Sequence, residues 1–314
     1  MKRSPGIKIG TIVGSLPLSI LMLTYVLFGV FSELTGDYLV YWNMYLNGSM
    51  ESFENQPIFT IYYEILRSII PIPEIFFVVV LIPWLIVISN HYFKSFFICR
   101  PVVFSLLLFL FCSFILQPSM LLFLLRQNLA ILIFLALLPS NVFIASFLAI
   151  GFHYSFAPII IIAYIVSVII RRLPKVANRL FYYLLLIIVF YLLSSKIFNF
   201  IFGLSMTNIP VIDNYISLYN QYDDIFPNFI GLRIFIFFGS LIYIFYVNKM
   251  SFVYKWVGAT TTSIFLISMA LSFSDSLSYR FLQAAKIPGF ILIAWYLYMK
   301  TDNKSNPEYF GGSI

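Results

Sequence analysis

Ten runs of mostly apolar residues divide this chain of 314 residues, and the polar segments between them are at most about 40 residues long. A helix needs roughly 20 apolar residues to cross the hydrocarbon core of a bilayer. The chain is 61% hydrophobic and 10% charged, whereas a soluble domain is nearer half apolar and a quarter charged. The pattern excludes a soluble enzyme, a fibrous protein and a disordered chain, and it predicts an all-α polytopic membrane protein with about ten (nine to eleven) transmembrane helices. The runs are Ile9–Phe31, Glu74–Asn90, Val102–Leu116, Met120–Leu138, Asn141–Phe152, Ala157–Ile170, Leu180–Gly203, Phe229–Val247, Trp256–Phe273 and Phe281–Met299.

Two of these assignments depend on local detail. The stretch from Asn141 to Ile170 has thirty residues, which is too long for one ordinary span. His153 and Pro158 interrupt it, so we predict a turn near His153–Phe156 between two short helices. The first run follows three basic residues and lacks a small-residue cleavage site, which favours an uncleaved membrane anchor.

The distribution of charge predicts the topology. With the N-terminus in the cytoplasm, thirteen of the nineteen basic residues lie on the cytoplasmic side, as the positive-inside rule requires. We therefore expect both termini in the cytoplasm, one integral membrane domain (1–314), outer loops at 32–73 and 204–228, and a cytoplasmic tail at 300–314. The basic residues are scattered between apolar runs, which indicates a lipid bilayer and no nucleic acid as partner. The thirteen are Lys2, Arg3, Lys8, Lys94, Arg100, Arg171, Arg172, Lys175, Arg179, Lys249, Lys255, Lys300 and Lys304.

Six basic residues do not lie on the predicted cytoplasmic side. Arg67 is in the first outer loop, and the other five lie inside predicted spans or at their outer ends. Arg126 lies six residues into its span, about 9 Å deep at helical rise. One interpretation is snorkelling, in which a long cation reaches the interface and does nothing else. The other is an anion site, because a cation at membrane depth should face a cavity or a partner. The six are Arg67, Arg126, Lys196, Arg233, Arg280 and Lys286.

Four short motifs in residues 30 to 160 resemble those of a known family. Asp37-Tyr38 is followed by Tyr41 and Tyr45, then by Gln56-Pro57; Arg126-Gln127 opens a span, and Phe152-His153-Tyr154-Ser155 follows at the predicted turn. This pattern is similar to that of the EpsG/Wzy family of polytopic bacterial polysaccharide polymerases. The region after 170 matches only in hydropathy and in one late outer arginine, Arg280. One position departs, because the Glu-Pro pair of the family is Gln56-Pro57 here; Glu54 is a possible substitute.

The resemblance implies an O-antigen polymerase, a GT-C-like glycosyltransferase of the bacterial inner membrane with its active site toward the periplasm. Its donor and acceptor would be undecaprenyl-pyrophosphate-linked oligosaccharides, with a chain-length regulator as a further partner. A ligase of the same broad class is a near neighbour. The alternative from another class is a flippase or transporter of lipid-linked oligosaccharide, which would place cations at mid-depth and show two related halves.

The reaction assigns roles to the charged residues. Negative charge grows on the departing pyrophosphate, so preorganised cations should stabilise it, and we predict that Arg126, Arg280 and Arg233 bind pyrophosphate. No Asp-x-Asp pair is present, and the adjacent Asp223-Asp224 fits a solvated loop, so we expect no metal and no cofactor.

The predicted catalytic base is His153, because the pKa of a free imidazole lies near neutral pH, or Asp37. A structural hydrogen bond at the helix turn is the alternative role for His153. Tyr38, Tyr41 and Tyr45 nearly share one helical face. They form either a sugar-binding platform or a belt at the membrane interface, where tyrosine and tryptophan gather.

Overall fold

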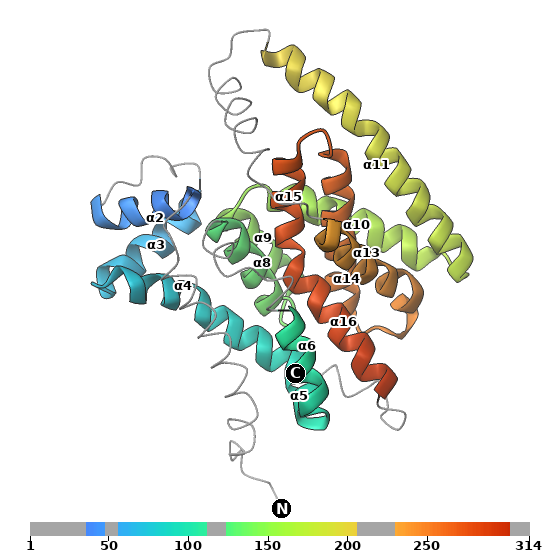
Figure 1. Cartoon of the computed structure of the whole chain (residues 1–314), viewed down its shortest axis with the longest axis horizontal. Helices are drawn as coiled ribbons and strands as arrows, with labels where there is room; N and C mark the ends of the chain where they lie inside the picture. Colours follow the sequence, from blue (N-terminus) through green and yellow to red (C-terminus); the bar gives the residue numbers. More distant parts are fainter. Residues whose placement is uncertain (1–35, 48–55, 112–123, 206–229, 302–314) are drawn as a thin grey trace, which may run out of the picture. The chain divides into compact units, whose positions relative to one another are not determined.

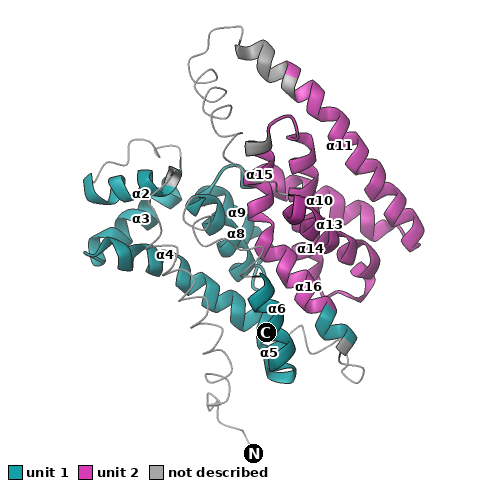
Figure 2. Ribbon diagram, viewed as in Figure 1, with its two compact units in different colours: residues 1–156, 297–302 teal, residues 157–296, 303–314 magenta. Residues whose placement is uncertain are grey.

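The computed structural model describes residues 36–47, 56–111, 124–205 and 230–301, and every regular element in these ranges is a helix (Figure 1). The residues group into two compact units, which Figure 2 shows in two colours. The first unit is formed by residues 1–156 and 297–302, and the second by residues 157–296 and 303–314. The predicted anchor Ile9–Phe31, the loop 204–228 beyond Ser205 and the tail beyond Thr301 lie outside the described residues.

The first unit contains seven of the described α-helices. Helix α9 packs against α8 and α3, and α8 also packs against α4. A π-helical turn at Ser89–Phe93 joins α4 to α5. The helices are α2 (Gly36–Asn47), α3 (Pro57–Ile69), α4 (Pro73–Ile88), α5 (Lys94–Cys99), α6 (Pro101–Leu110), α8 (Leu125–Leu137) and α9 (Val142–Phe152).

The second unit is built around α14, whose residues from Trp256 to Leu266 are all buried. Two hydroxyl residues of α14 are hydrogen-bonded: Thr261 donates to the Val257 carbonyl (2.8 Å), and Ser263 donates to the Ile159 carbonyl of α10 (2.7 Å). The α-helices described in this unit are α10 (Phe156–Arg172), α11 (Val176–Ser205), α13 (Ile230–Tyr246), α14 (Phe252–Ala270), α15 (Asp275–Ala284) and α16 (Lys286–Thr301), of which residues 297–301 group with the first unit.

Proline and asparagine set several helix starts. Pro57, Pro73 and Pro101 occupy the first positions of α3, α4 and α6, where the missing N–H costs nothing and the fixed φ suits a helix. Asn141 caps α9, because its Oδ1 accepts hydrogen bonds from the backbone N–H groups of Phe143 (2.8 Å) and Ile144 (3.2 Å). Such a cap satisfies donors that have no partner within the helix.

The predicted turn in the thirty-residue apolar stretch is confirmed. Helix α9 ends at Phe152 and α10 begins at Phe156. His153 is extended, with φ −154° and ψ 112°, so the backbone leaves the helical path there. Pro158 lies in the first turn of α10, where a proline is tolerated.

The last apolar run is bent rather than one straight helix. Leu277–Ala284 and Lys286–Lys300 meet at an angle of 44°. Pro288 has no N–H to donate to the Ala284 carbonyl, and the loss of such a bond bends a helix. Just before the bend, the Ala285 N–H donates to the Leu282 carbonyl at 3.0 Å. This bond spans three residues rather than four, so the turn is tighter than in an α-helix.

Three described helical segments are long and apolar enough to cross a membrane, and the bent pair makes a fourth if it counts as one span. The three are Pro73–Cys99, Val176–Ile197 and Ile230–Lys249. Further apolar helices at Pro101–Phe111, Leu125–Leu137 and Val142–Phe152 are shorter. The described chain is therefore an all-helical protein suited to a membrane, while ten spans and the orientation stay predictions.

Reporter fusions would test that topology. With the N-terminus in the cytoplasm, fusions after Arg172 and Lys300 should report the cytoplasm, and fusions after Ser49 and Asp223 should report the periplasm. The reason is the cytoplasmic excess of basic residues. A periplasmic signal at Arg172 would mean that α9 and α10 do not cross as two separate segments.

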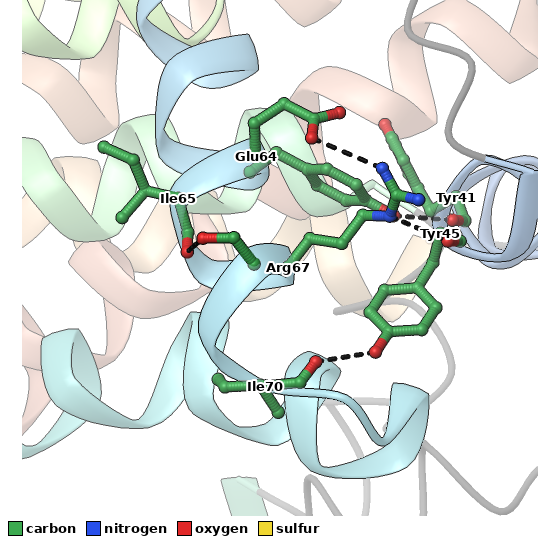
Figure 3. Close-up of polar contacts among 8 residues, drawn as sticks. Tyr41, Tyr45, Glu64, Ile65, Arg67 and Ile70 are labelled. Carbon is green, nitrogen blue, oxygen red and sulfur yellow. Dashed lines mark hydrogen bonds and ion pairs between the residues drawn. The ribbon is translucent and has the colours of Figure 1, made fainter.

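The predicted outer loop 32–73 contains α2 and α3, which polar contacts hold together (Figure 3). Arg67 donates from Nε to the Tyr45 carbonyl (2.9 Å) and pairs with Glu64 at 3.3 Å. The Tyr45 hydroxyl donates to the Ile70 carbonyl at 2.6 Å. Arg67, the basic residue of this predicted outer loop, therefore anchors α2 to α3.

Close packing of α9 on α3 predicts the effect of one substitution. A Cβ at Gly151 would lie 2.8 Å from Cγ1 and 3.2 Å from Cβ of Ile58, so Gly151→Ala should force the helices apart. We expect a loss of about 1–3 kcal/mol in the free energy of unfolding, measured by thermal or denaturant unfolding in detergent.

Two variants make this test specific. Ile58→Ala should recover part of the loss when it is combined with Gly151→Ala, because it empties the space that the new methyl group needs. Gly231→Ala is the matched control, since no atom lies within 4 Å of its added Cβ. Equal effects of the two glycine substitutions would contradict the packing described here.

Candidate functional site

The motifs that carry the family resemblance meet at Arg126 in the first unit. Arg126 Nε donates to the Tyr41 hydroxyl at 2.9 Å, and its guanidinium carbon lies 5.9 Å from the centre of the Tyr41 ring. With the Gln56 amide oriented to satisfy both of its neighbours, its oxygen accepts from Arg126 Nη1 (2.8 Å) and its nitrogen donates to the Phe152 carbonyl (2.8 Å). Four segments of the sequence therefore converge on one cluster, which we call the Arg126 cluster (Tyr41, Gln56, Arg126 and Phe152).

Each member of the cluster occupies a helix or a helix end. Tyr41 lies on α2, Gln56 directly precedes Pro57 at the start of α3, Arg126 is in the first turn of α8, and Phe152 ends α9. A helix end has backbone groups that lack helical partners, which explains why the Phe152 carbonyl can accept a side-chain bond. The arrangement depends on how four helices pack.

Tyr41 and Gln56, which both bind Arg126, are neutral and buried. Tyr41 is 1% exposed and Gln56 is 5% exposed. Tyr41 is itself oriented, because its carbonyl accepts a hydrogen bond from the Tyr63 hydroxyl at 2.8 Å. Hydrogen bonds to these side chains fix the plane of the guanidinium, and its planar N–H groups suit phosphate oxygens. The cluster is therefore chemically suited to an anion.

The three predicted sugar-binding tyrosines share one buried face of α2. Tyr38 and Tyr45 are 2% and 7% exposed; Tyr38 packs edge-on to Phe77 (5.0 Å between ring centres), and Tyr45 packs on Phe76 (5.0 Å). Burial, together with nearby Glu74, raises the pKa of Tyr38, so its hydroxyl stays neutral at physiological pH. The prediction of a shared face is confirmed, and the structure adds packing and hydrogen bonding to the sugar-contact and interface-belt interpretations, which stay predictions.

His153 makes a tight contact with its own turn. Its Nδ1 accepts the backbone N–H of Ser155 at 3.2 Å and lies 2.6 Å from the Ser155 hydroxyl. A backbone N–H can only donate, so in a neutral ring Nδ1 is the acceptor and the proton is on Nε2. In this state Nε2 is a hydrogen-bond donor rather than a base. The side chain is half-buried, and it stacks on Tyr154 at 5.4 Å between ring centres.

The rival base, Asp37, lies in the first turn of α2. Its side chain is outside the described part of the structure, so its role as a base stays a prediction. The same holds for Glu54, which precedes the described residues of α3.

The two outer arginines belong to the second unit. Arg233 on α13 donates from Nη2 to the Ser278 hydroxyl at 3.0 Å, and Ser278 donates to the Ser268 carbonyl at 2.9 Å. Arg280 lies on α15, two residues after Ser278. Each unit is described by itself, so a pyrophosphate site shared by Arg126, Arg233 and Arg280 stays a prediction.

Sequence reasoning missed the role of Gln56 as a ligand of Arg126. The sequence presented Gln56 only as a departure from the Glu-Pro pair of the family. A signal was available, because the pattern of the family pairs a glutamate at this position with an arginine at the position of Arg126. An acid and a cation that occur together are consistent with direct contact. Sequence reasoning also left open whether Lys286 snorkels, whereas the structure buries it.

In the described ranges, no group of three or more His, Cys, Asp or Glu side chains could hold a metal ion. Comparison of the chain with models of protein families, with curated proteins and with solved structures gives no match. What the fold defines is a class: an all-helical protein with apolar helices of membrane-spanning length. The family resemblance rests on the motifs alone.

The geometry at Gln56 predicts that the residue typical of the family is harmful in this chain. In Gln56→Glu, a carboxylate would face the Phe152 carbonyl, which now accepts a hydrogen bond from the amide. Its negative charge would also pair with Arg126 and reduce the potential available to an anion. We expect Gln56→Glu to lower the free energy of unfolding by about 1–3 kcal/mol.

The measurement is thermal unfolding of the purified variants in detergent at equal protein levels. The matched control is Gln127→Glu, the same change on α8 at a buried amide (7% exposed) outside the hydrogen bonds of the cluster. A Gln56→Glu variant as stable as the wild type would show that Arg126 tolerates a paired acid and that the Phe152 contact is dispensable.

Proposed function

We propose that this chain is an O-antigen polymerase of the bacterial inner membrane. The observation that supports it best is the Arg126 cluster, in which all four motifs of the resemblance contribute an atom to one hydrogen-bonded group. Unrelated motif matches would have no reason to meet in space. The apolar helices suit the membrane location that lipid-linked substrates require.

In the proposed reaction, a glycan moves from one undecaprenyl pyrophosphate carrier to a repeat unit on a second carrier. The bond between the anomeric carbon and the pyrophosphate oxygen breaks, and its electron pair leaves on that oxygen. The acceptor hydroxyl forms the new bond to the anomeric carbon and gives its proton to a base. No metal or cofactor takes part in this scheme.

Arg126 would bind the leaving pyrophosphate, where preorganised donors stabilise the charge that develops in the transition state. Arg233 and Arg280 are proposed as further pyrophosphate ligands. Since Nδ1 of His153 accepts the Ser155 N–H, we assign His153 a donor role through Nε2 and propose Asp37 as the base. Tyr38, Tyr41 and Tyr45 would position Arg126 and the sugar-binding face of α2.

A deletion strain tests the function. Lipopolysaccharide from a strain without this chain should lose the ladder of long chains and keep one repeat unit on the core. Loss of every repeat, including that one, would instead indicate a ligase or a flippase. A full ladder would contradict the proposed function, and complementation with the wild-type chain is the control.

A further inference from the structure

The bend between α15 and α16 contains two buried hydrogen-bond donors. Lys286, the first residue of α16, is 3% exposed, and Gln283, one turn earlier, is 5% exposed. The Lys286 ammonium makes no hydrogen bond or ion pair with another described residue. Tyr279 interacts with the Gln283 side chain, but Nε2 of Gln283 is buried with no acceptor among these residues.

Burial argues against snorkelling at this lysine. A snorkelling side chain extends along the protein surface and keeps its ammonium in water, as the exposed Lys196 on α11 can do. The Lys286 side chain is only 3% exposed, so protein covers nearly all of its stem. Removing an ammonium from water without a partner is costly, so the structure calls for an acceptor beside it.

The local electrostatics favour an anion as that acceptor. A helix N-terminus has a positive partial charge, and Lys286 adds a full charge at the first position of α16. Helical side chains lean toward the N-terminus of their helix, so Lys286 leans toward the bend that follows Gln283. Lysine and the amide nitrogen can only donate, and both need an oxygen to accept.

We propose that the α15–α16 bend binds a phosphate oxyanion, which accepts hydrogen bonds from Lys286 Nζ and Gln283 Nε2. The two helices qualify together as one broken membrane span. Half-helix N-termini at such breaks bind the anionic groups of ligands, and phosphate is the anion that membrane lipids present. The proposal rests on the bend itself and uses no residue of the Arg126 cluster.

The test is the melting temperature of the purified full chain in neutral detergent. The probes are inorganic pyrophosphate, phosphatidylglycerol and, as a lipid without phosphate, diacylglycerol. At a hundredfold excess over Kd we expect a rise of about 5 °C with a phosphate probe and none with diacylglycerol. Lys286→Met should abolish the rise and Gln283→Leu should reduce it, whereas Lys249→Met, at an exposed lysine, should keep it.

The two phosphate probes identify the source. A rise with phosphatidylglycerol alone assigns the site to a lipid headgroup, and a rise with pyrophosphate as well assigns it to a site open to soluble phosphate. No rise with either probe, or an equal rise in Lys286→Met, would overturn the proposal. Without a ligand, Lys286→Met should melt at or above the wild-type temperature; a clear fall or a failure to fold would show that the ammonium pairs within the chain, which also overturns it.

Discussion

Arg126→Lys is expected to lose polymerisation almost as completely as Arg126→Ala, by about 10²–10³-fold in turnover. The guanidinium makes two directed bonds at once, from Nε to Tyr41 and from Nη1 to Gln56. A lysine ammonium is a point charge on a flexible stem, and it cannot reproduce both bonds in one plane. The charge would remain, but its orientation toward an anion would be lost.

The measurement compares repeat-unit ladders, and then turnover by purified protein, at matched protein levels. Arg67→Lys is the matched control in the same unit, because Arg67 anchors α2 through Tyr45 and Glu64 and lies outside the Arg126 cluster. It should retain near wild-type turnover. Full ladders from Arg126→Lys would mean that charge alone is sufficient, and full ladders from Arg126→Ala would exclude Arg126 from the site.

The second large effect is expected at His153, where one substitution should lower the turnover and leave the melting temperature nearly unchanged. His153 Nδ1 accepts the N–H of the residue two positions later, which is the bond that an asparagine side chain makes in an Asx-turn. His153→Asn should therefore keep the turn between α9 and α10 and melt near the wild-type temperature. It has no counterpart of Nε2, so its turnover should fall by about 10²-fold or more.

His153→Ala is the companion variant. It removes the acceptor for the Ser155 N–H as well, so it should lose about 1 kcal/mol of stability in addition to the activity. If His153→Asn forms chains at a normal rate, His153 is a turn residue with no part in the chemistry. His153→Gln, whose longer amide reaches toward the Nε2 position, should recover more turnover than His153→Asn.

Much of the fold follows from local chemistry that a sequence displays. Helix starts at Pro57, Pro73 and Pro101 and the cap at Asn141 depend on residues within one turn. The turn after Phe152 was predictable because the apolar stretch from Asn141 to Ile170 is too long to be a single span. The helical class follows from apolar runs, because only helices and closed barrels satisfy their backbone within a membrane.

The site was only partly predictable, because its contacts join residues that are distant in the chain. Arg126 was identified from its depth and its motif, but its bond to Tyr41 depends on the packing of α8 and α2. The partner role of Gln56 depends on the end of α9. Likewise, the burial of Lys286 depends on the direction that α16 takes after the break between Ala284 and Lys286, which hydropathy does not determine.

The central claim is that this chain joins lipid-linked repeat units, and chain growth in a purified system tests it most directly. Wild-type protein in detergent, supplied with undecaprenyl-pyrophosphate-linked repeat units and no added metal, should form glycans longer than one repeat and release undecaprenyl pyrophosphate. Arg126→Ala protein at the same concentration, with a melting temperature equal to that of the wild type, should form about 10²–10³-fold less of these glycans. A folded wild-type protein that forms no chains from these substrates, or an Arg126→Ala variant that matches it, would contradict the account.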